Sequence, residues 1–182
     1  MTIILQALRL LAIVVWVGGL IFFALVLAPT AFHVLPSPHE AGTVVGATLR
    51  VLNEIGHFCG FIFVFASFPL WYRMSPRSRR LLMVEVPLIV LMVIATMYVQ
   101  TGIIPAMERD RAAAGGAIEN VPASDPARAD FNRLHSHSED VEGFALFLGL
   151  AVAVLVAAED GARRARPNAD HPLRRATDFN AG

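Results

Sequence analysis

Residues 86–107 read VPLIVLMVIATMYVQTGIIPAM and contain no charged side chain. The hydrocarbon core of a bilayer is about 30 Å thick, and a helix needs roughly 20 predominantly apolar residues to cross it. A surface helix of a water-soluble bundle would alternate polar and apolar faces, and this stretch does not. It therefore predicts a helix that spans a membrane.

Three further stretches have the same character. Residues 10–38 lack Asp, Glu and Arg, residues 55–72 contain one histidine and no formal charge, and residues 143–158 complete the set. Hydrophobic residues make up 55% of the 182-residue chain, and the mean hydropathy of +0.57 is above the range of soluble domains. These features predict an all-α fold, an integral membrane four-helix bundle formed by residues 1–160.

Prolines and glycines set the expected limits of the helices. Pro29 should end the first helix, which begins near Thr2, because a proline inside a helix removes a backbone hydrogen bond. The second helix should begin near His39 and be long, since an amphipathic segment precedes its apolar span. An outer loop between the third and fourth helices is expected over residues 112–130, which contain several glycines and prolines. Residues 161–182 are expected to form a disordered, Arg-containing cytoplasmic tail.

The distribution of arginine predicts the orientation in the membrane. Residues 71–80 carry four arginines and no acid, whereas residues 108–142 carry four arginines and eight acids. Arginine-rich short loops remain on the cytoplasmic side, so we expect both termini to be cytoplasmic in a protein of the cytoplasmic membrane. This topology explains the arginines without nucleic acid as a partner, and a formal net charge of zero gives no field to attract it.

Two pairs of glycines, each spaced four residues apart, lie in the predicted second helix. In lipid, such pairs let two helix backbones approach closely, and they would serve a homo-oligomer equally well. The simpler interpretation is that glycine is common in membrane helices. The candidate packing residues are Gly42, Gly46, Gly56 and Gly60.

Ionisable side chains within or beside membrane spans are costly and are therefore candidates for function. Helical spacing places Glu54 and His57 on one face of the second helix. It likewise places His135, Glu139 and Glu142 on one face of the fourth. All five lie towards the outer ends of their helices. Secondary candidates are Gln100, His137 and Ser138 at the same level and Glu85 near the inner end.

A metal ion or a haem is the cofactor that such a cluster would hold. Glu-x-x-His pairs contribute ligands to carboxylate-bridged metal sites in four-helix bundles, and mixed nitrogen and oxygen ligands favour Zn, Fe or Mn. His57 and His135 would alternatively act as axial ligands of a haem between the second and fourth helices.

The competing interpretation of these residues is structural. Glu54 would pair with Arg50 one turn earlier, and His135 would pair with Glu139. Glu85 would pair with nearby arginines at the inner interface, or, if it faces the bundle, it would belong to a proton path.

Three functional hypotheses follow. The leading one is a non-enzymatic membrane protein that binds a small ligand or metal in a polar His/Glu pocket at the outer membrane face, or that serves as an accessory subunit of a larger membrane complex. The alternatives are a metal- or haem-dependent membrane oxidoreductase and a small proton-coupled transporter. The sequence contains no phosphate-binding glycine loop, nucleophile elbow or His-Glu-x-x-His helix.

Several short motifs resemble those of a known family. Residues 131–138 read FNRLHSHS, with the pattern Phe-x-x-Leu-His-x-x-Ser, and residues 16–19 read WVGG. With Ala28-Pro29, Ala41-Gly42 and Ile104-Pro105, they resemble the transmembrane protein 205-like family, a four-span membrane domain of unknown function. The resemblance implies a membrane bundle and no particular chemistry. This chain departs from the family pattern at Glu142, where the family usually has asparagine.

Overall fold

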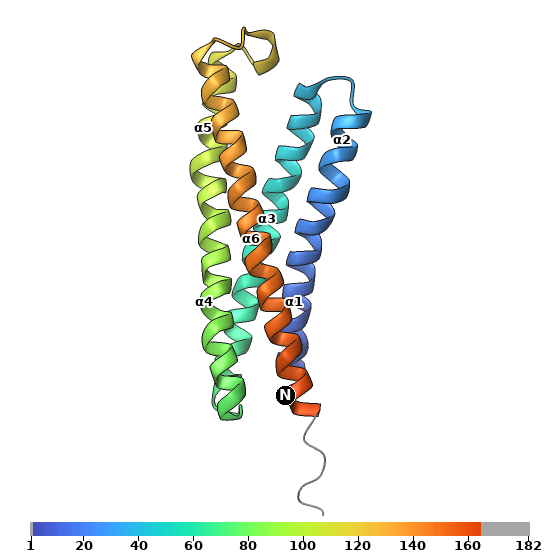
Figure 1. Cartoon of the computed structure of the whole chain (residues 1–182), viewed down its shortest axis with the longest axis vertical. Helices are drawn as coiled ribbons and strands as arrows, with labels where there is room; N and C mark the ends of the chain where they lie inside the picture. Colours follow the sequence, from blue (N-terminus) through green and yellow to red (C-terminus); the bar gives the residue numbers. More distant parts are fainter. Residues whose placement is uncertain (1, 165–182) are drawn as a thin grey trace, which may run out of the picture.

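The computed structural model describes residues 2–164, with side chains described up to Glu159. Figure 1 shows long helices that run up and down beside one another, as the all-α prediction requires. The elements in chain order are α1 (Thr2–Phe22), η1 (Phe23–Leu27), α2 (Ala28–Val34), α3 (Pro38–Trp71), α4 (Pro76–Tyr98), η2 (Val99–Ile103), α5 (Ile104–Ala113), η3 (Ile118–Asn120) and α6 (Pro126–Arg164).

Four helical columns are long and apolar enough to cross a membrane: Thr2–Val34, Pro38–Trp71, Pro76–Ala113 and Pro126–Glu159. They confirm the predicted four-span bundle, and α3 is the predicted long second helix. With 34 residues, α3 is about 50 Å long at 1.5 Å per residue, whereas the hydrocarbon core measures about 30 Å. The column therefore extends beyond the hydrocarbon.

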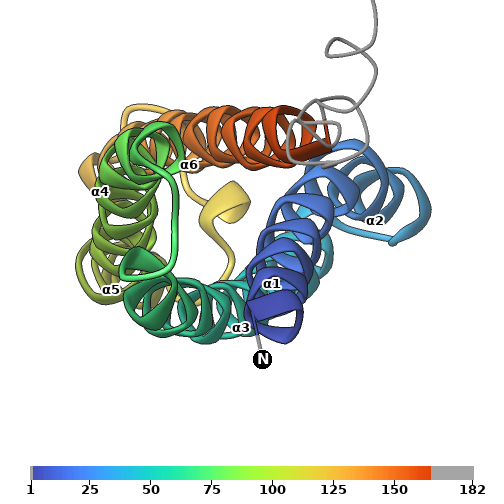
Figure 2. The same ribbon diagram turned by 90° about the horizontal axis from the view of Figure 1, so that it is seen from below.

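The columns form a four-sided ring when the bundle is viewed along its length (Figure 2). α1 and α4 each pack on both α3 and α6. We call the end with the α3–α4 turn the inner end, and the end with α2, α5 and η3 the outer end. At the outer end α2 packs on α3 and α5 packs on α6, and Figure 1 shows these two pairs diverging.

The first column does not end at Pro29, contrary to the prediction. A π-helical turn, η1, precedes Ala28-Pro29, and the backbone N–H of Ala28 bonds to the carbonyl of Phe23. The third column repeats this arrangement, because the N–H of Ile104 bonds to the carbonyl of Val99 just before Pro105. Proline fits the first turn of a helix, where its missing N–H costs nothing. The wide π turn creates such a first turn inside each column, so the helix continues.

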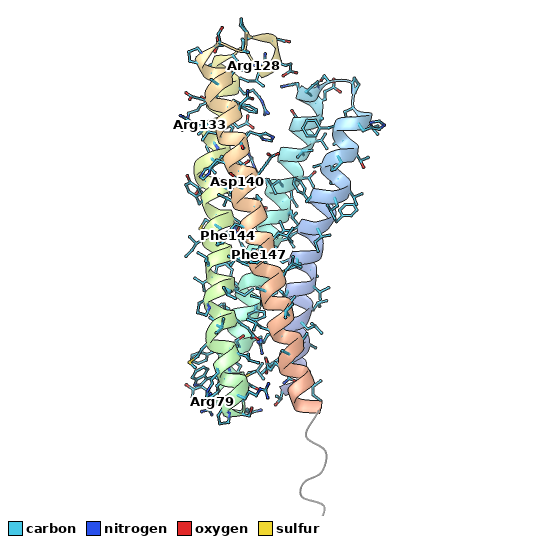
Figure 3. All side chains as sticks on the ribbon, viewed as in Figure 1. Arg79, Arg128, Arg133, Asp140, Phe144 and Phe147 are labelled. Carbon is cyan, nitrogen blue, oxygen red and sulfur yellow. The ribbon has the colours of Figure 1, made fainter. Side chains whose placement is uncertain are left out.

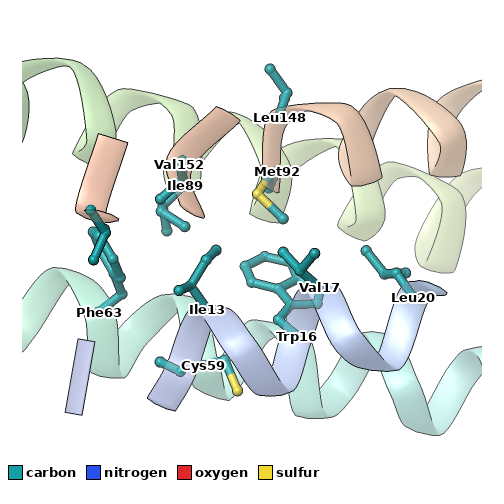
Figure 4. Close-up of a cluster of buried hydrophobic side chains, with 12 residues drawn as sticks. Ile13, Trp16, Val17, Leu20, Cys59, Phe63, Ile89, Met92, Leu148 and Val152 are labelled. Carbon is teal, nitrogen blue, oxygen red and sulfur yellow. The ribbon is translucent and has the colours of Figure 1, made fainter. Parts of the chain in front are cut away.

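Buried apolar side chains from four helices meet inside the ring (Figure 4). Trp16, Phe63, Met92 and Val152 come from α1, α3, α4 and α6 and are each at most 1% exposed. They belong to one cluster of apolar side chains drawn from all four helices, with Cys59 at its edge. Because lipid is as apolar as these side chains, close packing rather than exclusion of water holds such helices together.

Glycines in α3 allow α1 to approach. A Cβ atom added at Gly56 would lie 2.2 Å from Nε1 of Trp16, and one added at Gly60 would lie 3.2 Å from the same ring. The first distance is too short for a real side chain. At Gly60 the closest atom is Cγ2 of Val93 on α4, at 2.7 Å. Gly56 thus lies against the indole of Trp16, and Gly60 lies against both Val93 and that indole.

The outer connection is shorter than predicted. α5 continues to Ala113 and α6 begins at Pro126, so much of the expected loop at residues 112–130 is helical. Oδ1 of Asp125 accepts a hydrogen bond from the N–H of Ala127 at 2.9 Å, and this cap starts α6 ahead of the Phe131 motif. At the other end of the chain, α6 extends to Arg164, beyond the boundary expected at residue 160. The remainder of the predicted tail lies outside the described residues.

Candidate functional site

A cavity of about 430 Å³ lies between the diverging outer halves of the helices. Its walls come from α2 and α3 on one side and from α5 and α6 on the other. Most of the wall is apolar, whereas carboxylates and arginines occupy the rim and the deep end. The apolar wall residues include Phe23, Phe32, Val45, Leu49, Ile104, Met107 and Phe131.

Glu142 of α6 lines the cavity and is held by Asn53 of α3. Nδ2 of Asn53 donates a hydrogen bond to Oε1 of Glu142 at 2.7 Å. Asn53 is fully buried, although Glu54, the next residue in the helix, is exposed. Oδ1 of Asn53 and Oε2 of Glu142 are also buried, and within the described chain neither has a hydrogen-bond partner. The pair thus joins α3 to α6 and leaves two acceptor oxygens unsatisfied.

Three more predicted site residues on α6 line the same cavity: His135, Ser138 and Glu139. Nε2 of His135 lies 3.3 Å from Oε1 of Glu139, and both side chains are largely exposed. Ser138 donates to the backbone carbonyl of His135 at 2.7 Å. These contacts are local to one helix, as the structural interpretation expected for His135 and Glu139.

Two arginines line the cavity near its outer rim. Arg111 of α5 lies 3.2 Å from Glu108, and its guanidinium stacks over the ring of Phe131 at 5.3 Å. Arg128 of α6, labelled in Figure 3, donates to the carbonyl of Val121 at 2.7 Å. Arg128 therefore fixes the outer connection to α6, and Arg111 joins α5 to α6 through Phe131.

The predicted residues of α3 lie elsewhere. Glu54 is exposed and does not line the cavity, because its neighbour Asn53 occupies the inward face. Nε2 of His57 lies within hydrogen-bond distance of Oγ1 of Thr96, at 3.0 Å, so this histidine joins α3 to α4 and does not meet His135.

Two secondary candidates also contact other elements. Gln100 donates to the carbonyl of Arg50 at 3.4 Å, which connects η2 to α3. The ring of His137 makes an edge contact with Tyr98, with centroids 6.0 Å apart. Neither residue lines the cavity.

The predicted five-residue metal set does not come together. Among the described residues, no group of three or more His, Cys, Asp or Glu side chains could hold a metal ion. The reason is helical phase, because Glu54 points away from the ring and His57 turns towards α4. Only the α6 half of the expected cluster faces the cavity.

Gly42 and Gly46 do not pack helices, contrary to the prediction. Both line the cavity. A Cβ atom added at Gly46 would meet nothing within 4 Å, and one added at Gly42 would meet only Arg111, at 3.7 Å. Here the glycines widen the cavity instead of bringing two backbones together.

A second polar cluster lies near the inner end and joins three helices. Arg9 of α1 forms an ion pair with Glu85 of α4 and lies 3.2 Å from Glu159 of α6. All three side chains are at most 3% exposed. The guanidinium of Arg9 also lies 4.8 Å from the ring centroid of Phe63. Arg9 therefore fastens α1, α3, α4 and α6 at one level.

Glu85 thus faces the bundle and does not depend on the inner-loop arginines for a partner. Arg79, labelled at the inner end in Figure 3, instead donates from Nε to the carbonyl of Trp71 at 2.9 Å. Sequence analysis missed Arg9, Glu159 and Asn53. Arg9 and Glu159 border apolar stretches, and charges at such borders are normally assigned to the interface.

The two polar clusters bracket the apolar core. Glu142 and Glu159 are 17 residues apart on α6, which corresponds to about 25 Å along the helix axis. That separation is somewhat less than the roughly 30 Å thickness of a hydrocarbon core. Trp16, Phe63 and Met92 of the core cluster lie between the cavity and the Arg9 cluster.

Comparison with known families adds one finding. A family model described as "Domain of unknown function (DUF4149)" matches residues 11–114. The chain belongs to this family. The DUF4149 match begins in α1 and ends just after α5, so it covers three of the four columns and leaves out α6. No curated protein and no solved structure matches the chain.

Proposed function

We propose that this membrane protein is non-enzymatic and binds a small molecule in the cavity between the outer halves of its helices. The observation that carries the proposal is the cavity itself, about 430 Å³ in volume, with apolar walls and with Glu142, the hydrogen-bond partner of Asn53, in its lining. Ligand sites in proteins are typically 300–1,000 Å³, mostly apolar and furnished with a few polar groups. This cavity has that size and that composition.

The proposal is tested by photolabelling. The protein in phosphatidylcholine nanodiscs is irradiated with a diazirine analogue of octanol, and the labelled peptides are identified by mass spectrometry. We expect label in residues 42–49 and 131–142, which line opposite walls of the cavity. Gly46→Leu should reduce this labelling at least fivefold, because its side chain would extend into open space within the cavity.

Gly18→Leu is the matched control. Gly18 lies in α1, is exposed, does not line the cavity and also has nothing within 4 Å of an added Cβ. Its labelling pattern should equal that of the parent protein. Label spread evenly over lipid-facing residues, or unchanged labelling in Gly46→Leu, would show that the cavity binds nothing.

We also propose that the outer end faces away from the cytoplasm and that both termini are cytoplasmic. Four arginines near the α3–α4 turn and the acidic outer connection support this orientation. In a Cys59→Ala background, Ser124→Cys should react with a membrane-impermeant maleimide in intact cells, and Arg77→Cys should react only after lysis. Both positions are exposed. The reverse pattern would invert the topology.

The resemblance to the transmembrane protein 205-like family remains a proposal alongside the DUF4149 match. Its motif residues have clear structural tasks in this chain, since Trp16 packs on Gly56 and both motif prolines follow π turns. A role as an accessory subunit or homo-oligomer is compatible with ligand binding. The oxidoreductase and transporter hypotheses gain no specific support from the site.

A further inference from the structure

We propose that the ligand is a protonated organic amine, with an alkyl or aryl body in the cavity and its ammonium group hydrogen-bonded to Glu142. This inference rests on the proposed function, because it requires the cavity to be a binding site. It adds the chemical class of the ligand and names the residue that would recognise its charge.

The first argument is the unsatisfied hydrogen-bonding capacity of the Asn53–Glu142 pair. Oδ1 of Asn53 and Oε2 of Glu142 are buried acceptors, and neither has a donor within the described chain. A buried polar group without a partner is costly. An ammonium group carries N–H donors and a positive charge, so it matches the carboxylate of Glu142, the member of the pair that lines the cavity. An anionic ligand would add a second negative charge beside Glu142.

The second argument is the charge of the cavity lining. Four carboxylates line it, and only two arginines do. Arg111 is paired with Glu108, and Arg128 donates to backbone carbonyls of the outer connection. Glu142 forms no ion pair with any described residue. Glu142 is therefore the carboxylate of the lining with which a cationic ligand would pair. The carboxylates are Glu108, Glu119, Glu139 and Glu142.

The third argument is the apolar wall around Glu142. Phe23, Phe32 and Phe131 line the cavity together with aliphatic side chains of α3 and α5. These surfaces suit a hydrocarbon or aromatic body, and aromatic rings also attract cations. A bare metal ion would find too few ligands there, as no described cluster could hold one. The apolar body of an amine would pack against the wall of the cavity, and its ammonium group would bind the carboxylate of Glu142.

The experiment uses competition against the photolabel described above, in neutral phosphatidylcholine nanodiscs. Four competitors share one chain length: octylammonium, octyltrimethylammonium, octanol and octanoate. We expect octylammonium to compete best and octanoate worst. Glu142→Gln should weaken competition by octylammonium roughly tenfold, which corresponds to about 1.4 kcal/mol, while competition by octanol stays the same. The glutamine retains an oxygen for Asn53, so the helix contact persists.

Asp140→Asn is the matched control. Asp140 lies two residues earlier on α6, is exposed and does not line the cavity. This variant should bind octylammonium like the parent protein, and both variants share the same partitioning of amine into the bilayer. A difference between them therefore reports on Glu142 alone.

The possible failures are distinguishable. Absence of specific photolabel would overturn the proposed function itself. Specific label with octylammonium no better than octanol would leave the cavity as a ligand site and overturn the amine. Equal competition by octyltrimethylammonium, which has no N–H donor, would overturn the hydrogen bonds to Glu142. Unchanged amine competition in Glu142→Gln would do the same.

Discussion

Replacing Arg9 with methionine is expected to lower the free energy of unfolding by about 3–5 kcal/mol, the typical cost of breaking a buried ion pair by removing one member. Glu85 and Glu159 would lose the guanidinium that they share, and both carboxyl groups are almost completely buried. Unfolding by SDS titration in lipid–detergent micelles, followed through the fluorescence of Trp16 and Trp71, measures the change.

Two further variants separate charge from packing. Arg133→Met removes an exposed arginine that pairs with Asp130 on the surface of α6, and such pairs contribute about 0–1 kcal/mol. The triple variant Arg9→Met/Glu85→Gln/Glu159→Gln removes the two carboxylates that face Arg9 together with its guanidinium, so most of the lost stability should return. If Arg9→Met proves as mild as Arg133→Met, the inner cluster does not hold the helices together.

Gly56→Ala is expected to destabilise the protein by about 2 kcal/mol, within the range for overpacked cores. Its Cβ would lie 2.2 Å from Nε1 of Trp16, and that ring is fixed within the core at 1% exposure. α1 and α3 would have to move apart. The same SDS titration measures the effect.

Gly46→Ala is the matched control for helix propensity. It lies in the same helix with nothing within 4 Å of the added Cβ, so the higher helix propensity of alanine should stabilise α3 by up to about 1 kcal/mol. Trp16→Leu should relieve the clash, so the loss from Gly56→Ala should shrink in that background. Additive losses in the double variant would contradict the proposed contact.

Apolar length alone predicted the fold, because a membrane imposes one dominant rule: backbone groups in lipid must be satisfied within a helix. The π turns within two of the columns were harder to predict. Pro29 looks like a helix end in sequence, since a proline inside a helix removes a backbone hydrogen bond. Only the backbone geometry reveals that a π turn precedes Pro29, and likewise Pro105.

The candidate site was predicted on one side only. Residues 135–142 of α6 follow helical periodicity into the cavity, and four of the five residues predicted there line it; His137 does not. On α3 the prediction selected Glu54 and His57 because they are ionisable, and it passed over Asn53. An uncharged amide gives no signal in a search for charges. Asn53 matters because it faces Glu142 on α6. The periodicity of one helix does not show which residue of another helix lies opposite.

The paired π turns have a mechanical consequence. Below them, the columns are joined by the guanidinium of Arg9 and by the apolar core; above them, α2 and α5 lie on opposite walls of the cavity. Each of these two helices joins its column through one widened turn followed by proline. We therefore expect a change in the width of the cavity to arise from bending at these two turns, while the core below keeps its packing.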